Sequence, residues 1–135
     1  MMAQEADAVR SDLISVLVVD DEPQVVWVLK FSLEAEGYRT FAAHNGVEAL
    51  REIAEHHPNV MVLDIMMPTM DGWSVLREMM KLPREERPRV VVVSALASVL
   101  DRAKAVELGA DAYMPKPFDV DDLLAVLRGL EVLSS

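Results

Sequence analysis

The sequence contains no cysteine among its 135 residues. This absence excludes disulfide bonds, a thiol nucleophile and any metal centre that depends on thiolate ligands. It is also compatible with a protein that works in the reducing cytoplasm. The chemistry of any functional site must therefore come from oxygen and nitrogen side chains.

Positive charge and long apolar runs are also scarce. Thirteen lysines and arginines stand against 23 aspartates and glutamates, which gives a formal net charge of −10. Long-range repulsion therefore argues against nucleic acid or an anionic membrane as a direct partner. Residues 1–13 have neither a basic start nor a long apolar stretch, as a signal peptide would. No later run reaches the roughly 18 apolar residues that a membrane span needs. We expect a soluble, cytoplasmic protein.

What the chain does contain is an alternation of two patterns. Apolar residues make up 52% of the sequence, and its length suits one compact domain. Five short apolar or β-branched runs alternate with five helical patterns, and the runs cover residues 14–19, 38–42, 59–63, 89–93 and 111–114. Three of the runs are almost continuously apolar, which predicts strands buried on both faces of a parallel sheet. The alternating run 38–42 predicts an edge strand.

The helical segments have start and stop signals of their own. Pro23 suits the first turn of a helix, and Gly37 suits the stop that follows it. Asn45 and Glu48 have the spacing of a capping box at the start of the second helix. The alternation of strands and helices predicts the α/β class, with one doubly wound parallel sheet covered by helices on both faces.

The apolar faces of the helices predict part of the core. Val25, Leu29 and Leu33 share one face of the first helix. We expect both tryptophans, Trp27 and Trp73, to be partly buried packing residues.

Polar side chains stand where the predicted strands end. Ligands of a doubly wound sheet bind beyond the carboxyl ends of its strands. Asp20 and Asp21 follow the first run, Asp64 the third and Ser94 the fourth, while Lys116 comes shortly after the fifth. Three carboxylates, a hydroxyl and an ammonium are therefore predicted to converge on one rim.

The charges of this rim indicate its ligands. Three neighbouring carboxylates repel one another unless a cation compensates them. Oxygen ligands without histidine or cysteine favour magnesium, calcium or manganese over zinc, and magnesium suits a small carboxylate set that leaves room for phosphate oxygens. Lys116 and Ser94 suit an arriving phosphoryl group, which needs a second positive charge and a hydrogen-bond donor. Asp64 is the expected nucleophile, because carboxylates form acyl phosphates and Asp64 stands alone on the central strand.

Four stretches, VVDDEP, VLDIMMPTMDG, VVVVSA and AYMPKPF, resemble the signature sequences of the receiver domain of bacterial two-component response regulators. They occur in the order and at the spacing of that family, within residues 13 to 131. The resemblance implies a single flavodoxin-like (βα)5 domain over residues 13–133, with five parallel strands in the order 2-1-3-4-5. Residues 1–12 would then be a flexible N-terminal segment.

The resemblance also implies a role for each metal and phosphoryl ligand. Asp64 would accept a phosphoryl group from a sensor histidine kinase or a phosphotransfer protein. Mg²⁺ would be held by Asp20, Asp21, Asp64 and the backbone carbonyl of Met66. Lys116 would turn toward the phosphoryl group through a cis bond to the proline that follows it.

A switch is implied by two further residues, Ser94 as the switch hydroxyl and Tyr113 as the switch aromatic. Their movement would alter the surface of the fourth helix, fifth strand and fifth helix, which we expect to carry Arg102, Lys104, Glu107, Asp111 and Arg128. Through this surface the domain would control a downstream effector or an attached output domain, and homodimerisation is a second expected use of it. Such a protein is not an enzyme in the usual sense, because it catalyses only its own phosphoryl transfer and dephosphorylation.

The resemblance also bears on the lifetime of the phosphorylated state and on the length of the natural chain. Met66 and Leu96 stand where the family flanks the path of the hydrolytic water, and neither can orient water. We therefore expect a phosphorylated state that is long-lived for its class.

No output domain follows the last predicted helix in this sequence, although DIMMPTMDG is a phrase frequent in regulators that have a DNA-binding domain.

Two alternative functions stay open. A haloacid-dehalogenase-like phosphohydrolase would use Asp20 as its nucleophile and Glu22 as its acid. The segment SALASVLD lacks the final acidic pair of that family, however, and the chain has no cap domain. A phosphorylation-independent adaptor would keep the fold without the chemistry.

Overall fold

The computed structural model describes residues 14–95 and 98–134, with the side chains of 131–134 excepted. Its strands and helices are β1 (Ser15–Val19), α2 (Pro23–Ala35), β2 (Arg39–Ala43), α3 (Gly46–His56), β3 (Val60–Asp64), α4 (Gly72–Met79), β4 (Arg89–Ser94), α5 (Val99–Glu107), β5 (Ala112–Pro115) and α6 (Val120–Ser134), and a short 3₁₀ helix, η1 (Arg84–Glu86), precedes β4. The expected flexible segment 1–12 and the predicted site residue Leu96 lie outside the described residues. None of the described helices combines the length and apolar character needed to cross a membrane.

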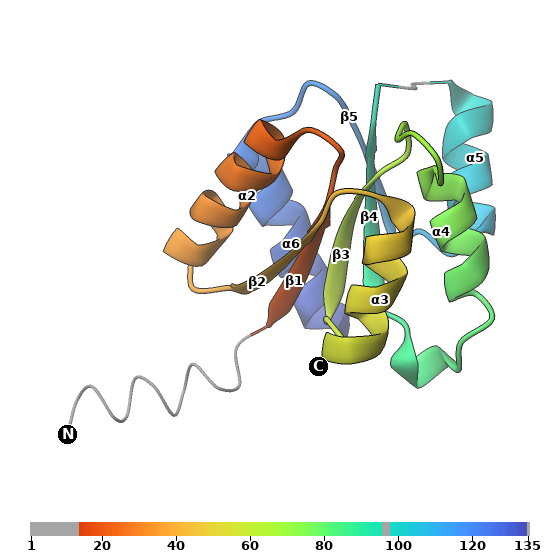
Figure 1. The fold of residues 1–135 in the computed structure, drawn as a ribbon. Coiled ribbons are helices and arrows are strands. Elements are labelled where there is room, and N and C mark those ends of the chain that lie inside the picture. The colour runs from red at the N-terminus through yellow and green to blue at the C-terminus, as the bar shows by residue number, and fades with distance from the viewer. Residues whose placement is uncertain (1–13, 96–97, 135) are drawn as a thin grey trace.

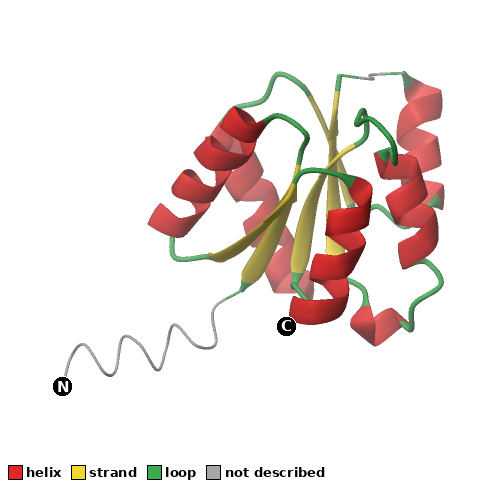
Figure 2. Ribbon diagram, viewed as in Figure 1, coloured by secondary structure: helices red, strands yellow, loops and turns green. Residues whose placement is uncertain are grey.

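The five strands form one parallel sheet in the order β2-β1-β3-β4-β5. Helices α2 and α6 cover one face of the sheet, and α3, α4 and α5 cover the other (Figure 1). Strands and helices alternate along the whole described chain (Figure 2). These findings confirm the predicted doubly wound α/β fold and the place of β2 at an edge.

Each central strand supplies side chains to both faces of the sheet. Val16 and Val18 of β1 pack in the apolar core under α2 and α6, whereas Leu17 and Val19 pack in the core under α3, α4 and α5. Strands β3 and β4 alternate in the same way, because successive residues of a strand point to opposite faces. The continuously apolar runs of the sequence are thus explained by burial on both sides.

The predicted helix signals are found at the ends of the helices. Pro23 occupies the first turn of α2, and Gly37 follows its last turn with a φ of 96°, a left-handed conformation that glycine adopts without strain. The Asn45 side chain accepts a hydrogen bond from the Glu48 backbone at the start of α3, and Glu48 in turn accepts one from the His44 backbone. This arrangement is a close variant of the predicted capping box, because the second hydrogen bond comes from the residue before the N-cap instead of from the N-cap itself.

The predicted apolar face of α2 is found, and one predicted side chain of that helix is not where we expected it. Leu29 and Leu33 are buried and Val25 is half-buried against the same core, which also includes the buried Val26. Trp27 is 67% exposed and stacks on the exposed ring of Phe31, with ring centroids 5.6 Å apart. The prediction that Trp27 is a partly buried packing residue is therefore wrong.

Candidate functional site

The pairing of the strands brings the predicted site residues to one edge of the sheet. Val19 pairs with Leu63, so Asp20, which follows Val19, lies beside the end of β3 at Asp64. Ser94 pairs with Pro115 of β5, which places Lys116 next to Ser94. In a parallel sheet all carboxyl ends lie at the same edge, the upper one in Figure 1.

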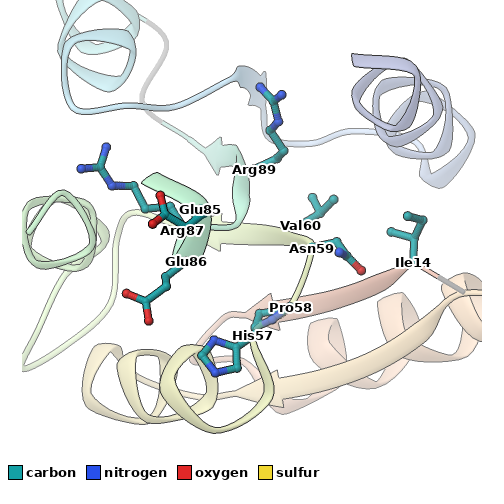
Figure 3. Close-up of a pocket in the computed structure, with 9 residues that line it drawn as sticks. All are labelled: Ile14, His57, Pro58, Asn59, Val60, Glu85, Glu86, Arg87 and Arg89. Carbon is teal, nitrogen blue, oxygen red and sulfur yellow. The ribbon is translucent and has the colours of Figure 1, made fainter. Parts of the chain in front are cut away.

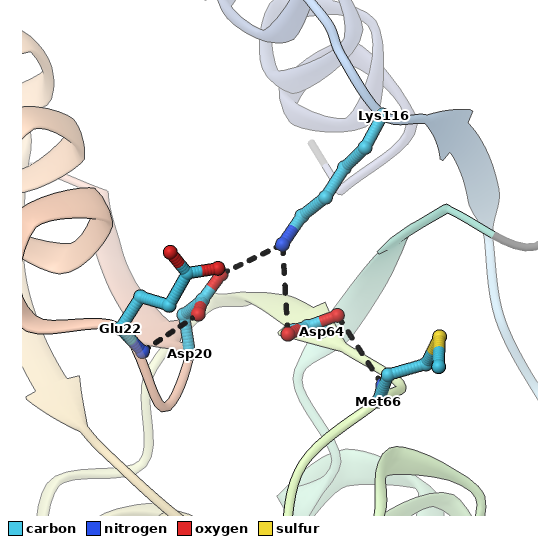
Figure 4. A network of polar contacts seen from close by, with 5 residues as sticks. All are labelled: Asp20, Glu22, Asp64, Met66 and Lys116. Atoms are coloured by element: carbon cyan, nitrogen blue, oxygen red, sulfur yellow. Dashed lines mark hydrogen bonds and ion pairs between the residues drawn. The ribbon is translucent and has the colours of Figure 1, made fainter.

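Lys116 joins the two buried carboxylates of this edge (Figure 4). Its Nζ lies 3.0 Å from Oδ2 of Asp20 and 3.5 Å from Oδ2 of Asp64. The other oxygen of each aspartate accepts a backbone hydrogen bond, from Glu22 to Asp20 at 2.9 Å and from Met66 to Asp64 at 3.3 Å. The bond between Lys116 and Pro117 is cis, as the resemblance implies.

Burial and neighbouring charges act in opposite directions on the two ionisable groups of this contact. Burial raises the pKa of the Asp64 carboxyl, and the charge of Asp20 adds to that rise, whereas Lys116 opposes it. Burial by itself would lower the pKa of Lys116, but its hydrogen bond to Asp20 and the charges of Asp64 and Asp20 outweigh burial and raise that pKa. Lys116 therefore remains a cation, and it helps to keep Asp64 ionised.

Asp21 completes a group of three carboxylates. One oxygen each of Asp20, Asp21 and Asp64 lies within 4.8 Å of the others, with Asp21 the most exposed of the three. Such a set suits a hard divalent cation, because it holds more negative charge than Lys116 neutralises. The Met66 side chain is 58% exposed and points away from this group (Figure 4), so it does not obstruct a cation there.

The two predicted switch residues lie on neighbouring strands. Ser94 is fully buried, and its carbonyl accepts a hydrogen bond of 2.8 Å from the Lys116 backbone. Tyr113 is half-buried against the core, and the guanidinium of Arg102 lies 5.0 Å from the centre of its ring. The Tyr113 ring therefore lies beneath the Arg102 side chain of α5.

Two of the residues expected on the surface of α5, β5 and α6 have partners elsewhere. Arg128 of α6 lies 3.4 Å from Glu36 at the end of α2, so it faces α2 instead of β5. Asp111 lies 3.3 Å from Arg89 and accepts a hydrogen bond from the Val90 backbone, at the start of β4. Sequence spacing places a residue on a helix or strand without showing its neighbours, so neither pairing was predicted.

Two open grooves flank the edge that carries the site. One, of about 600 Å³, is largely apolar and runs between α2 and the segment after β5, from Glu22 to Lys116 and Phe118. The other, of about 530 Å³, lies beside Asp21 and includes Arg51 and Thr69. A third groove of about 360 Å³ lies at the opposite edge of the sheet and contains no predicted site residue (Figure 3).

Sequence reasoning gave no role to Gly72, although it belongs to the quoted VLDIMMPTMDG stretch. A Cβ atom at this position would lie 2.6 Å from the carbonyl oxygen of Asp64 and 2.7 Å from Cα of Ile65. The Gly72 backbone also donates a hydrogen bond of 2.9 Å to the Ile65 carbonyl. The loop after β3 thus closes directly against the residue that carries the candidate nucleophile, and only glycine fits there.

Comparison with known proteins agrees with this geometry. Residues 16–128 match the model of the response regulator receiver domain family. The chain belongs to this family. Response regulator MprA of Mycobacterium ulcerans (strain Agy99) is 43% identical to the receiver over 117 residues, which are 87% of this chain and 50% of that protein. The corresponding protein of Mycobacterium avium (strain 104) is 44% identical over 115 residues, 85% of this chain and 50% of its own length. The chain thus spans about half of these curated relatives.

Solved structures of other receivers have the same fold. The receiver domain of the Francisella response regulator 1452 superimposes with a TM-score of 0.84 at 33% identity, over 90% of this chain and 99% of that one. A CheY-like receiver domain protein from Methanospirillum hungatei JF-1 gives 0.81 at 32% identity, over 87% and 93%. A third structure, the BeF3-activated receiver domain of DrrB, gives 0.77 at 30% identity, over 88% and 98%.

Proposed function

We propose that this receiver is a phosphorylation-activated switch in which Asp64 accepts a phosphoryl group from a sensor histidine kinase or a phosphotransfer protein. The observation that supports this most strongly is the position of Lys116, whose ammonium contacts both Asp20 and Asp64 at the carboxyl edge of the sheet. A cation placed there neutralises the nucleophile before transfer and the phosphoryl oxygens after it.

Asp64 is better suited than Asp20 to be the nucleophile. Both oxygens of Asp20 are engaged, one by the Glu22 backbone and the other by Lys116 at 3.0 Å. Asp64 has longer contacts, 3.5 Å to Lys116 and 3.3 Å to the Met66 backbone. In the proposed step an oxygen of Asp64 forms a bond to phosphorus, the bond from phosphorus to the donor nitrogen breaks, and the electron pair leaves with the imidazole. The hydrolase alternative, which requires Asp20 to attack, is disfavoured by these contacts.

Asp20, Asp21, Asp64 and the Met66 carbonyl are the proposed ligands of Mg²⁺. When bound, the ion would offset the charge of the carboxylates and of the arriving phosphoryl group. The backbone hydrogen bonds from Glu22 to Asp20 and from Met66 to Asp64 would keep these two carboxylates oriented for the ion.

The apolar groove beside Lys116 is the proposed landing surface for the phosphodonor protein. Its walls are formed by α2 and the segment after β5, and their apolar members include Val25, Val28, Leu29, Phe118 and Val120. Val28 is 46% exposed, and the exposed pair Trp27 and Phe31 lies on the same helix. A donor helix in this groove would bury apolar surface next to the nucleophile, which favours transfer by positioning the two proteins.

The output side of the proposed switch is the surface of α5, β5 and α6. A phosphoryl group on Asp64 would offer Ser94 a strong acceptor, and a shift of Ser94 would change the packing around Tyr113. Val99, Leu100 and Val106 of α5 are 81%, 81% and 67% exposed, so a partner could bury them. The partner would be a downstream effector, an attached output domain or a second copy of the receiver.

Mass spectrometry tests the proposed chemistry directly. The protein is incubated with a small acyl phosphate and Mg²⁺, and the site of the phosphoryl adduct is mapped after reductive trapping. We expect one adduct on Asp64, no adduct without Mg²⁺, and none in the Asp64→Asn variant. An adduct on Asp20 would favour the hydrolase, and an unmodified protein would favour the adaptor.

A further inference from the structure

Helix α5 is held to the rest of the receiver by few apolar contacts. Ala105 is its only buried residue among Val99–Glu107. Its larger apolar side chains, Val99, Leu100 and Val106, are all more than 60% exposed. Because burial of large apolar side chains supplies most of the packing free energy, the position of this helix depends on other contacts.

Two such contacts join cations of α5 to aromatic rings. Arg102 lies over Tyr113, the predicted switch aromatic. Lys104 lies over Trp73 of α4, with its Nζ 4.4 Å from the ring centre. Trp73 is only 8% exposed and Lys104 is half-buried, and such removal from water strengthens the attraction between a cation and an aromatic face.

Trp73 is also tied to the phosphoacceptor through the backbone. It directly follows Gly72, which packs against the Asp64 carbonyl and donates a hydrogen bond to Ile65. A shift of the end of β3 must therefore be transmitted to the first turn of α4, because no free space separates the two segments. Trp73 would move with that turn relative to Lys104.

We infer that Trp73 and Lys104 form a second link between Asp64 and α5, separate from the route through Ser94 and Tyr113. The Lys104–Trp73 contact occurs together with the direct ion pair between Lys116 and Asp64, and we assign both to the state before phosphoryl transfer. It holds α5 in that state and weakens when the phosphoryl group arrives. The inference rests on the proposed function and assigns regulation to two residues outside the phosphorylation site.

Because coupling between two sites is reciprocal, the link has a measurable effect at Asp64. Lys104→Met keeps most of the side-chain stem and removes the charge. Loss of a contact present only before transfer should tighten the binding of beryllofluoride with Mg²⁺, a phosphoryl mimic, by about two- to fivefold. Lys104→Arg retains a cation and should restore the wild-type affinity.

The affinity can be followed by the fluorescence of Trp73. The chain has two tryptophans, so a Trp27→Phe background leaves Trp73 as the single emitter. Beryllofluoride is titrated at fixed Mg²⁺ into this protein and into its Lys104→Met, Lys104→Arg and Lys81→Met derivatives. Lys81 is the matched control, because it lies in the turn after α4, its side chain is 74% exposed, and its ion-pair partner among the described residues is Glu78 of α4.

Tighter binding by Lys104→Met, with unchanged affinity in the Lys104→Arg and Lys81→Met proteins, supports the link. Equal affinity in Lys104→Met and Lys81→Met overturns it. The same comparison in a Ser94→Ala background tests whether the two routes are separate. If Lys104→Met no longer tightens beryllofluoride binding in that background, the Trp73–Lys104 link is part of the route through Ser94 and Tyr113. If beryllofluoride with Mg²⁺ binds none of the proteins, the proposed function itself fails and the inference fails with it.

Discussion

Replacing Asp64 by asparagine should stabilise the receiver in metal-free buffer. Asp64 is 4% exposed, and its carboxylate lies within 4.8 Å of oxygens of Asp20 and Asp21, with Lys116 at 3.5 Å as its counter-charge. At an effective dielectric constant of about 20, one like pair at that separation costs about 3.5 kcal/mol and the Lys116 pair contributes about 4.7 kcal/mol. Two repulsions and the cost of burial therefore outweigh one attraction.

Asparagine keeps the shape of the side chain and an oxygen that can accept the Met66 hydrogen bond. We expect the free energy of unfolding to rise by about 1 kcal/mol, or the melting temperature by roughly 3 to 5 °C for a chain of this size. Thermal unfolding at pH 7 with EDTA measures the change. Glu85→Gln, an exposed acid at the opposite edge of the sheet, is the matched control and should change little.

The gain should also depend on pH. Because burial, with the charge of Asp20, raises the folded-state pKa of Asp64 above its ordinary value of 3.8, the native protein binds the proton more tightly than the unfolded chain. The charge of Asp64 does not destabilise the protein below the ordinary pKa, where the carboxyl is protonated in both the native and the unfolded chain. The destabilisation appears as the pH rises above that value and is complete once the pH has passed the raised pKa of the native protein. The advantage of Asp64→Asn should thus be full at pH 7 and vanish near pH 4.

Magnesium should reverse the order of the two proteins. At a concentration ten times its Kd, the ion stabilises the wild type by about 1.4 kcal/mol, whereas the variant lacks one ligand charge and gains less. A lower melting temperature for Asp64→Asn in EDTA, or an equal gain at pH 4 and pH 7, would refute this electrostatic account of the site.

Three further substitutions test the geometry around Asp64. Thr69 has a φ of 69°, which is strained for a β-branched residue, so Thr69→Gly should raise the free energy of unfolding by about 1 kcal/mol in urea titrations, and Thr69→Val, which keeps the branch, should not. Gly72→Ala should lower the free energy of unfolding by about 1 to 3 kcal/mol and slow phosphorylation, because its Cβ would meet the Asp64 backbone. Gly129→Ala on α6 is the control, because its Cβ meets nothing and the change should be neutral or stabilising. Equal effects of the two variants would contradict this role of Gly72. Met66→Glu should shorten the lifetime of phosphorylated Asp64 several-fold in a phosphate-release assay, since a carboxylate there can orient water, and an unchanged lifetime would argue against the water path.

The fold and the membership of the rim could be predicted from the sequence because both depend on local patterns. Apolar runs fix the strands, and parallel pairing then brings their ends together, so Asp20, Asp64, Ser94 and Lys116 meet without any knowledge of side-chain contacts. Successive residues on one strand face opposite sides of the sheet, so the sequence also indicates which strand side chains share a face.

The neighbours of individual side chains are harder to predict than the fold. On α2, Val25 and Val26 are both apolar and both pack against the core, but only the packing against the sheet decides that Val26 is the more buried of the two. Trp27 is exposed because none of the described elements covers the outer side of α2, which composition cannot show. The pairing of Arg128 with Glu36 depends on how α6 lies beside α2.

The division of the apolar interior into two cores has an evolutionary consequence. The proposed donor groove belongs to the layer of α2 and α6, whereas Trp73, Lys104 and Tyr113 belong to the layer of α4, α5 and β5. Distant substitutions with no shared neighbours act additively on stability. Substitutions that alter binding of the phosphodonor protein on one side of the sheet can therefore accumulate without compensating changes on the other side. After gene duplication, two receivers could come to bind different donors while both keep the same partner surface on α5, β5 and α6.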